Sequence, residues 1–205
     1  MNLNFQRDHW KSFIQKATQD ELASNLNASW NPNTQTFNQH TPLPKIVLDT
    51  LQGKISHNKV LDFGVGLGRN YNYLKSLFAT AHGYDLPEML ARNTIVPKDN
   101  LFSNLDTLPS DYDLVYEVTV MQHMPPQEVL FCLQQLARKS KYYFTHTRSY
   151  NDFCRDFDNK TGGINMYSLV ASTNVWRPLI QTPGKLADLN DESHHFVLYK
   201  SKLIP

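Results

Sequence analysis

The sequence has few cysteines, no long apolar run and almost no excess of charge of either sign. Its two cysteines, Cys132 and Cys154, are too few for a disulfide framework and have no CxxC partner for a metal site. No apolar stretch approaches the roughly 18 residues needed to cross a bilayer. The N-terminal residues MNLNFQRDHWKSF lack the apolar centre of a signal peptide. We therefore expect a cytoplasmic protein without a membrane segment.

The charge balance disfavours a nucleic-acid partner. Twenty Lys and Arg residues against 19 Asp and Glu residues give a formal net charge of +1, whereas proteins that bind nucleic acid usually carry a strongly basic surface. An RNA substrate held by a local patch stays open. The adjacent His194 and His195 have no third ligand at a suitable spacing, so no metal is predicted.

The length of 205 residues suits a single domain over residues 1–205. Apolar residues spaced by three and four predict one or two amphipathic helices over residues 5–26. Residues 27–44 are rich in Asn, Thr, Gln and Pro and are predicted to be a loop. We expect residues 1–44 to form an N-terminal helical cap over the active site, and residues 45–205 to form the core.

From residue 45 onward, predicted helices and strands alternate. Strands are predicted at 59–63, 80–84, 100–103, 112–118, 141–145 and 196–200, and helices at 45–52, 69–78, 87–93 and 125–139. Such alternation predicts an α/β fold with an open, mostly parallel central sheet flanked by helices.

The stretch VLDFGVGLGRN, residues 60–70, places three glycines directly after the first predicted core strand. Glycine is required where a side chain would collide with a ligand or where φ is positive. The dinucleotide pattern GxGxxG fails because its third glycine is replaced by Arg69, and no GxxxxGK[ST] phosphate loop is present. The pattern is instead DxGxGxG, formed by Asp62, Gly64, Gly66 and Gly68.

Asp62 at the end of this strand is a poor neighbour for a pyrophosphate, because two negative charges would face each other. It is a good neighbour for the ammonium group of an amino acid. The stretch alone therefore favours a ligand with an amino-acid end, while another nucleotide or a purely structural turn stays open.

Three later segments strengthen this interpretation. GYDLPEMLAR places Asp85 at the end of the second core strand, where an acid can accept hydrogen bonds from both hydroxyls of a ribose. NLDTLP and YDLVYEVTVMQHMPP follow in order. Together with VLDFGVGLGRN, these segments resemble the consecutive motifs of class I S-adenosylmethionine-dependent methyltransferases over about residues 58–146.

The resemblance implies a Rossmann-like fold, S-adenosyl-L-methionine as cofactor and a set of binding residues. Asp62 and the backbone of the first two glycines would hold the methionine part, with Arg69 near its carboxylate. Asp85 would bind the ribose, Leu86 would pack on the adenine, and Asn104 and Leu105 would lie at the adenine edge. Glu117 and Val118 would line the cavity by the sulfonium. The cofactor-binding residues are therefore Asp62, Gly64, Gly66, Gly68, Arg69, Asp85, Leu86, Asn104, Leu105, Glu117 and Val118.

Two departures from the family pattern weaken parts of this assignment. Asn104 stands where the family commonly has an acid, and its amide oxygen can still accept a hydrogen bond. In GYDLPEML, the run between the ribose-binding acid and the Pro-Glu pair is one residue shorter than is usual in the family. This difference weakens the assignment of Leu86 to packing on the adenine.

The candidate catalytic residues are His123 and Glu117. His123 follows the fourth core strand and is the best candidate for a general base, although a role in closing the turn stays open. Glu117 could steer a cationic substrate or orient the loop.

We expect an enzyme, a methyltransferase that acts on an oxygen or nitrogen of a small-molecule acceptor. Aromatic residues in 1–44 and 149–195, among them Phe13 and Trp176, would suit the rim of a pocket for a partly apolar substrate. The alternatives are a non-catalytic S-adenosylmethionine-binding scaffold, and an RNA or protein methyltransferase. The oligomeric state is not predicted.

Overall fold

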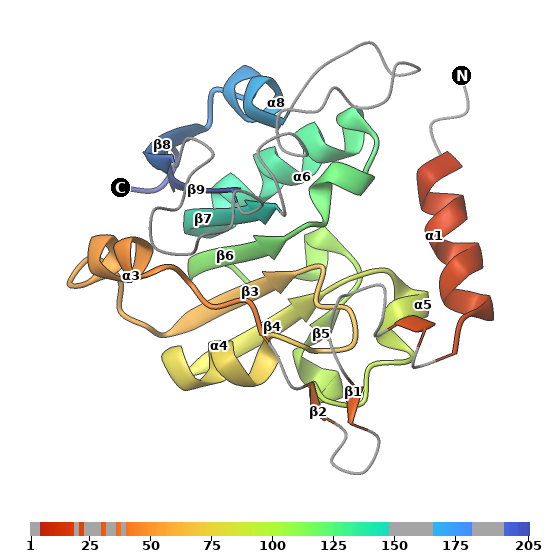
Figure 1. Cartoon of the computed structure of the whole chain (residues 1–205). Coiled ribbons are helices and arrows are strands. Elements are labelled where there is room, and N and C mark those ends of the chain that lie inside the picture. Colours follow the sequence, from red (N-terminus) through yellow and green to blue (C-terminus); the bar gives the residue numbers. More distant parts are fainter. Residues whose placement is uncertain are drawn as a thin grey trace. The chain divides into compact units, whose positions relative to one another are not determined.

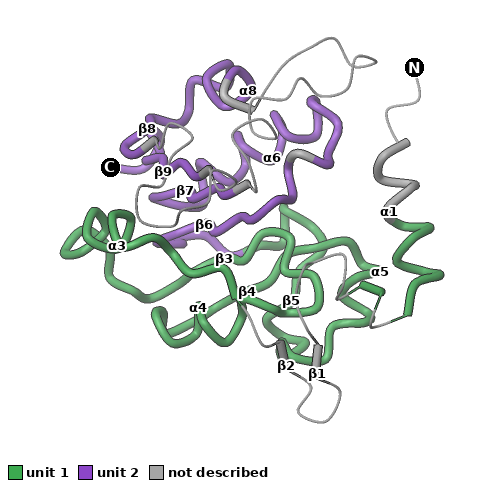
Figure 2. The backbone as a smooth tube through the Cα atoms, in the orientation of Figure 1, with its two compact units in different colours: residues 1–108 green, residues 109–205 purple. Residues whose placement is uncertain are grey.

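The computed structural model describes residues 5–18, 21–22, 30–31, 36–37, 40–147, 166–181 and 195–205. The chain divides into two compact units, residues 1–108 and residues 109–205, coloured green and purple in Figure 2. Each unit has its own strands and its own buried apolar residues. The interpretation of residues 1–205 as one domain stays a prediction.

The first unit contains three parallel strands in the order β5-β4-β3 (Figure 1). β3 (Lys59–Phe63) pairs along its whole length with β4 (Thr80–Tyr84), and the end of β4 pairs with β5 (Leu101–Phe102). Val60 and Leu61 are fully buried, as expected for a parallel strand covered on both faces. All three predicted strands of this unit are confirmed, although the third is shorter than predicted.

Each of the first two strands leads into a short helix. α4 (Tyr71–Leu77) follows β3, and α5 (Pro87–Leu90) follows β4. α4 begins later than predicted because the N–H of Gly68 bonds back to Val65, so that these residues form a turn. α5 ends earlier than predicted because the next N–H groups bond to carbonyls three residues back, which is the tighter pattern of a helix end. Two further single turns are η1 (Lys98–Asn100) and η2 (Leu105–Thr107).

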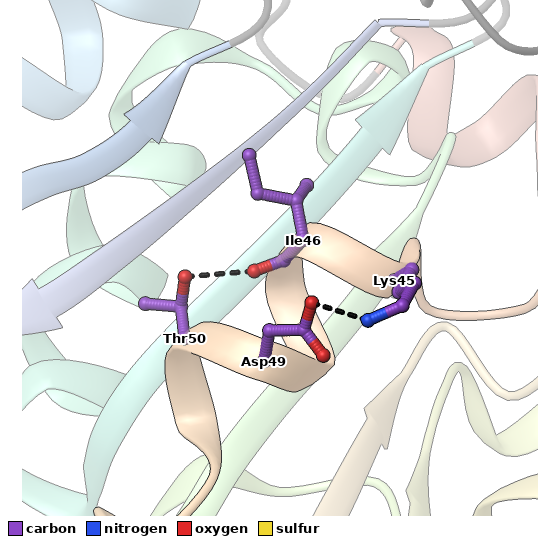
Figure 3. A network of polar contacts seen from close by, with 4 residues as sticks. All are labelled: Lys45, Ile46, Asp49 and Thr50. Atoms are coloured by element: carbon purple, nitrogen blue, oxygen red, sulfur yellow. Dashed lines mark hydrogen bonds and ion pairs between the residues drawn. The ribbon is translucent and has the colours of Figure 1, made fainter.

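α3 (Lys45–Leu51) precedes β3 and confirms the helix predicted at 45–52. A Lys45–Asp49 ion pair of 2.6 Å lies on its exposed face, and the hydroxyl of Thr50 donates to the carbonyl of Ile46 at 2.7 Å (Figure 3). Exposed ion pairs of this spacing contribute only about 0.3–0.5 kcal/mol. Burial of the opposite, apolar face therefore provides most of the stability of this helix.

The N-terminal segment begins with α1 (Phe5–Lys16). Past its end, the hydroxyl of Thr18 accepts from the N–H of Glu21 at 3.2 Å, and the Glu21 carboxylate accepts from the N–H of Thr18 at 2.6 Å. This reciprocal pair is a capping box, which marks the start of a helix. Of the one or two helices predicted over residues 5–26, it favours two.

The predicted loop at 27–44 contains a short antiparallel pair, β1 (Trp30–Asn31) and β2 (Thr36–Phe37). The loop prediction is therefore wrong for these residues, whose sequence gives little sign of a strand. The end of the segment is tied to α4 because the N–H of Leu43 donates to the hydroxyl of Tyr73 at 2.8 Å.

The second unit contains four strands in the order β6-β7-β9-β8. β6 (Tyr112–Val118) and β7 (Ser140–Thr147) are parallel, whereas β9 (His195–Ser201) is antiparallel to both β7 and β8 (Trp176–Gln181). The predicted strands of this unit are confirmed, but β8 was not predicted. It contains Pro178, which cannot donate to a sheet, and its position at the edge tolerates that residue.

α6 (Pro126–Lys139) connects β6 to β7 and confirms the helix predicted at 125–139. Its apolar stripe is buried, and it consists of Val129, Leu133, Leu136 and Ala137. α8 (Met166–Ser172) packs near α6 and was not predicted. No helix within the described ranges is long and apolar enough to cross a membrane.

Candidate functional site

The loop after β3 contains three glycines in the left-handed conformation. Gly64, Gly66 and Gly68 have φ values of 82°, 53° and 93°, which residues with a side chain rarely adopt. The N–H groups of Gly64 and Val65 both donate to the carbonyl of Tyr84, at 2.8 and 3.1 Å. The loop is therefore tied at its start to the end of β4. We call residues 64–68 the glycine loop.

Asp85 follows β4, and its carboxylate is built into the glycine loop. Oδ2 accepts from the N–H of Gly66 at 2.8 Å, and Oδ1 accepts from the N–H of Leu86 at 2.7 Å. Desolvation raises the pKa of Asp85 to about 6, while these two bonds act to lower it. Each carboxylate oxygen has two lone pairs, so both can accept a further bond. Asp85 can therefore hold the loop and also bind a pair of ligand hydroxyls.

Asp62 lies in β3 and is only 2% exposed. Its Oδ2 is buried and has no hydrogen-bond partner among the described residues. Burial raises the pKa of Asp62 to about 7; the charge of Arg69 lowers it and that of Asp85 raises it. An unpaired buried acceptor costs about 1–3 kcal/mol. This oxygen is therefore suited to a cationic donor from a ligand.

Asn93 is a part of this site that was not predicted. It is 1% exposed, and its Nδ2 donates to the carbonyl of Gly66 at 2.8 Å. Its Oδ1 accepts from the N–H groups of Ile95 and Val96, at 3.1 and 2.9 Å. No periodic pattern marks such a residue, because it acts on the backbone of a loop 27 positions away.

The predicted adenine-edge residues lie at the turn η2. Asn104 is exposed, and its Oδ1 accepts from the N–H of Asp106 at 2.9 Å, which caps the turn. Leu105 is 5% exposed. The geometry gives Asn104 a structural role, and contacts of either residue with adenine stay predictions.

The N-terminal segment packs against elements of the predicted cofactor site. An apolar cluster joins it to the glycine loop and to α5, with Leu86 packed against it; its buried members are Ile14, Ala17, Leu22, Leu67 and Met89. Arg92 fixes the end of α1, because its Nη1 donates to the carbonyls of Ile14, at 2.7 Å, and Ala17. Lys11 also lies 3.5 Å from Glu88.

Replacing Arg92 with alanine is expected to release α1 from α5. The change leaves two helix-end carbonyls without their donor, at a cost of about 1–3 kcal/mol. Amide hydrogen exchange within residues 5–18 should therefore become about tenfold faster. Lys98→Ala is the matched control, since Lys98 bonds to the carbonyls of Leu90 and Asn93, at 3.0 Å each, and not to α1. Equal exchange in wild type and Arg92→Ala would contradict this role.

In the second unit, the buried carboxylate of Glu117 accepts four hydrogen bonds. Oε1 accepts from the N–H groups of Val120 and Met121, at 2.6 and 3.1 Å. Oε2 accepts from the hydroxyls of Tyr143, at 3.3 Å, and Thr145. Burial raises the pKa of Glu117, and the four bonds, led by that from Thr145, act to lower it. This geometry favours a role in orienting the loop after β6.

The loop after β6 is strained at Thr119, which has a φ of 58°. A branched residue in this conformation costs on the order of 1–3 kcal/mol. Val118, the last residue of β6, is half-buried, and His123 is exposed at the end of η3 (Met121–His123). The assignments of Val118 to the cofactor and of His123 to catalysis stay predictions. The described ranges hold no group of three or more His, Cys, Asp or Glu side chains suited to a metal ion.

Comparison with known sequences gives no relative. No family model matches the chain, and no curated protein matches it.

Comparison with solved structures is informative about the fold. The magnesium protoporphyrin IX methyltransferase ChlM of Synechocystis PCC 6803, crystallised with bound SAM, is 12% identical with a TM-score of 0.59; the match covers 96% of this chain and 97% of that one. A second match is a chain in the complex between the Haloferax volcanii Trm112 methyltransferase activator and a methyltransferase. It is 12% identical with a TM-score of 0.54, and the match covers 98% of this chain and 97% of that one. The mitomycin 7-O-methyltransferase MmcR is 10% identical with a TM-score of 0.51, and the match covers 98% of this chain and 69% of that one. The chain therefore has the Rossmann-like fold of class I S-adenosylmethionine-dependent methyltransferases.

Proposed function

We propose that this chain is an enzyme, a methyltransferase that uses S-adenosyl-L-methionine. The observation that carries the proposal is the buried, unpaired Oδ2 of Asp62 at the end of β3, next to the glycine loop. That oxygen fits the ammonium group of an amino acid, and a charge-assisted hydrogen bond of this kind is strong.

The other residues of the first unit fit the rest of the cofactor. Asp85 has lone pairs free to accept from both ribose hydroxyls while it holds the N–H of Gly66. The N–H groups of Gly64 and Gly66 already donate within the protein. Their carbonyl oxygens are therefore the backbone groups that would face the ammonium, that of Gly66 through the lone pair that its bond from Asn93 leaves free. Arg69 lies close enough to Asp62 to affect its pKa, and it would pair with the cofactor carboxylate.

Bound S-adenosyl-L-methionine would supply a methyl group on a sulfonium, which is an excellent leaving group. The protein must then align the acceptor with that methyl, and alignment can contribute about 7–11 kcal/mol in favourable cases. A general base is needed only when the acceptor has to lose a proton, where it contributes about 10²–10⁴-fold. We assign that role to His123.

We further propose that the acceptor is an oxygen or nitrogen of a small molecule. Two structures that match nearly the whole chain are, by name, methyltransferases of magnesium protoporphyrin IX and mitomycin. The near-neutral charge also supports a small-molecule acceptor over RNA. Of the aromatic residues predicted to line a pocket, Trp176 is instead 3% exposed and donates to the carbonyl of Leu133 at 3.0 Å. Trp176 therefore belongs to the core of the second unit.

Calorimetric titration with S-adenosylmethionine and S-adenosylhomocysteine tests the cofactor assignment. We expect binding by wild type and a loss of at least about 100-fold in Asp85→Ala, which removes both the ribose acceptor and the anchor of Gly66. No binding by wild type, or unchanged binding by Asp85→Ala, would overturn the assignment. A label-transfer screen with pools of metabolites, peptides and RNA then identifies the acceptor class. Tight binding without transfer to any pool would favour a non-catalytic scaffold.

A further inference from the structure

Gly66 is held from both sides by side chains of the segment that follows β4. Its N–H donates to Asp85 and its carbonyl accepts from Asn93, both at 2.8 Å. A peptide group on each side of Gly66 is therefore fixed in orientation. Asp85 belongs to the predicted family motif, whereas Asn93 lies outside it.

Asn93 is itself rigidly placed. Its side-chain oxygen accepts from the N–H groups of Ile95 and Val96, which closes a tight turn on the side chain. Its own carbonyl accepts from Nζ of Lys98 at 3.0 Å. Asn93 is 1% exposed. The oxygen of its side-chain amide thus stabilises its own turn, and one N–H of that amide holds the glycine loop.

The turn also determines how closely the loop can approach. A Cβ on Gly68 would lie 2.9 Å from the Cβ of Ile95, a distance that real side chains do not reach. The segment 93–96 and the glycine loop are therefore packed so closely that a side chain at Gly68 would collide with Ile95. A shift of either one would move the other.

We propose that Asn93 is a positioning residue for the cofactor, which sets the shape of the glycine loop through the carbonyl of Gly66. This inference rests on the proposed function, since the bound group is S-adenosylmethionine. Without the bond from Asn93, the peptide after Gly66 can rotate. The loop then no longer presents its backbone and Asp85 in one fixed arrangement, and binding has to order it first.

Asn93→Asp is the sharpest test. The aspartate keeps an oxygen to accept from Ile95 and Val96, but it places a second oxygen against the carbonyl of Gly66 where a donor stood. We expect the dissociation constant of S-adenosylhomocysteine, measured by calorimetry, to rise about 30-fold. Asn100→Asp is the matched control: Asn100 donates to the hydroxyl of Tyr71 at 3.1 Å and not to the carbonyl of Gly66, and its variant should bind as wild type does.

Stoichiometry separates positioning from a loss of folding. A variant with an irreversibly misfolded fraction would bind fewer equivalents of ligand with the wild-type dissociation constant, and one that unfolds reversibly at the assay temperature would show a lowered midpoint of thermal unfolding. The positioning role predicts near-full stoichiometry with a raised dissociation constant. If Asn93→Asp does not fold, Ile95→Ala removes the Cγ2 that also packs against Gly68, loosens the segment 93–96 against the glycine loop and should raise the dissociation constant about fivefold.

The failures are distinguishable. Wild type that does not bind S-adenosylhomocysteine overturns the proposed function itself. Wild type that binds, together with wild-type dissociation constants in Asn93→Asp and Ile95→Ala, overturns only the role of Asn93.

Discussion

Replacing Asp62 with asparagine is expected to abolish most cofactor binding and, at the same time, to stabilise the unliganded protein above neutral pH. The carboxylate is almost fully buried with one unpaired oxygen, so its charge is costly until a cation pairs with it. Asparagine has nearly the same shape and no charge. We expect binding of S-adenosylmethionine to weaken at least about 100-fold.

The stability effect depends on pH. The pKa of Asp62 is raised from 3.8 to about 7 in the folded protein. The folded state therefore binds the proton more tightly than the unfolded state does. The loss of folding stability caused by the buried charge of Asp62 is absent below the unfolded pKa of 3.8. It grows as the pH rises towards about 7 and is constant above that. Three pKa units set its upper limit at about 4 kcal/mol.

Thermal unfolding of wild type and Asp62→Asn at about pH 5 and about pH 8 measures this difference. The gain of the variant should be full at the higher pH and reduced to about two fifths of that value at the lower one. Asp113→Asn is a matched control, because Asp113 is a buried acid that already pairs with Lys141 at 3.3 Å. That variant should lose stability and keep cofactor binding. An equal gain for Asp62→Asn at both pH values, or wild-type binding, would contradict the role of Asp62.

The same pKa predicts the pH dependence of binding in wild type. Below about pH 7 Asp62 holds a proton that has to leave before the carboxylate can pair with an ammonium group. Affinity for S-adenosylhomocysteine should therefore fall by up to about tenfold per pH unit below that point. Calorimetry in two buffers of different ionisation enthalpy should detect release of a proton on binding near pH 6. No proton release would contradict the raised pKa.

The parts of the fold that could be predicted are those in which local sequence and burial agree. Val60 and Leu61 form an apolar run that only a covered strand can bury, and the glycines after it adopt the left-handed conformation that their pattern predicts. β8 could not be predicted, because Pro178 is unfavourable in a strand unless the strand lies at an edge. Edge position is set by the pairing of distant strands, which the local sequence does not encode.

In the candidate site, too, the residues that could be predicted are those marked by local sequence. Asp85 could be predicted because it ends a strand within an ordered series of motifs. Asn93 and Arg92 could not, because they bond to backbone carbonyls 27 and 75–78 positions away. A carbonyl is present at every residue, so the partner of such a side chain leaves no mark in the sequence. Residues that shape the loop are thus harder to predict than residues that would touch the ligand.

The two roles open to Glu117 predict different results for alanine and glutamine. Glu117→Ala removes the acceptor for four hydrogen bonds, two from the loop backbone and two from the hydroxyls of Tyr143 and Thr145. We expect a loss of about 3–5 kcal/mol in the free energy of unfolding. For a chain of this size that loss lowers the midpoint of thermal unfolding by about 10 °C.

Glu117→Gln keeps the shape of the side chain. Its oxygen can still accept from Val120 and Met121, and its amide can donate to the hydroxyls of Tyr143 and Thr145, which also accept. If Glu117 orients the loop, this variant should unfold within about 1 kcal/mol of wild type and retain methyl transfer within about tenfold. If a negative charge is needed for a cationic substrate, transfer should fall by more than about 100-fold with unfolding unchanged. The four bonds around the carboxylate leave little capacity for a substrate, and for that reason we expect the first result.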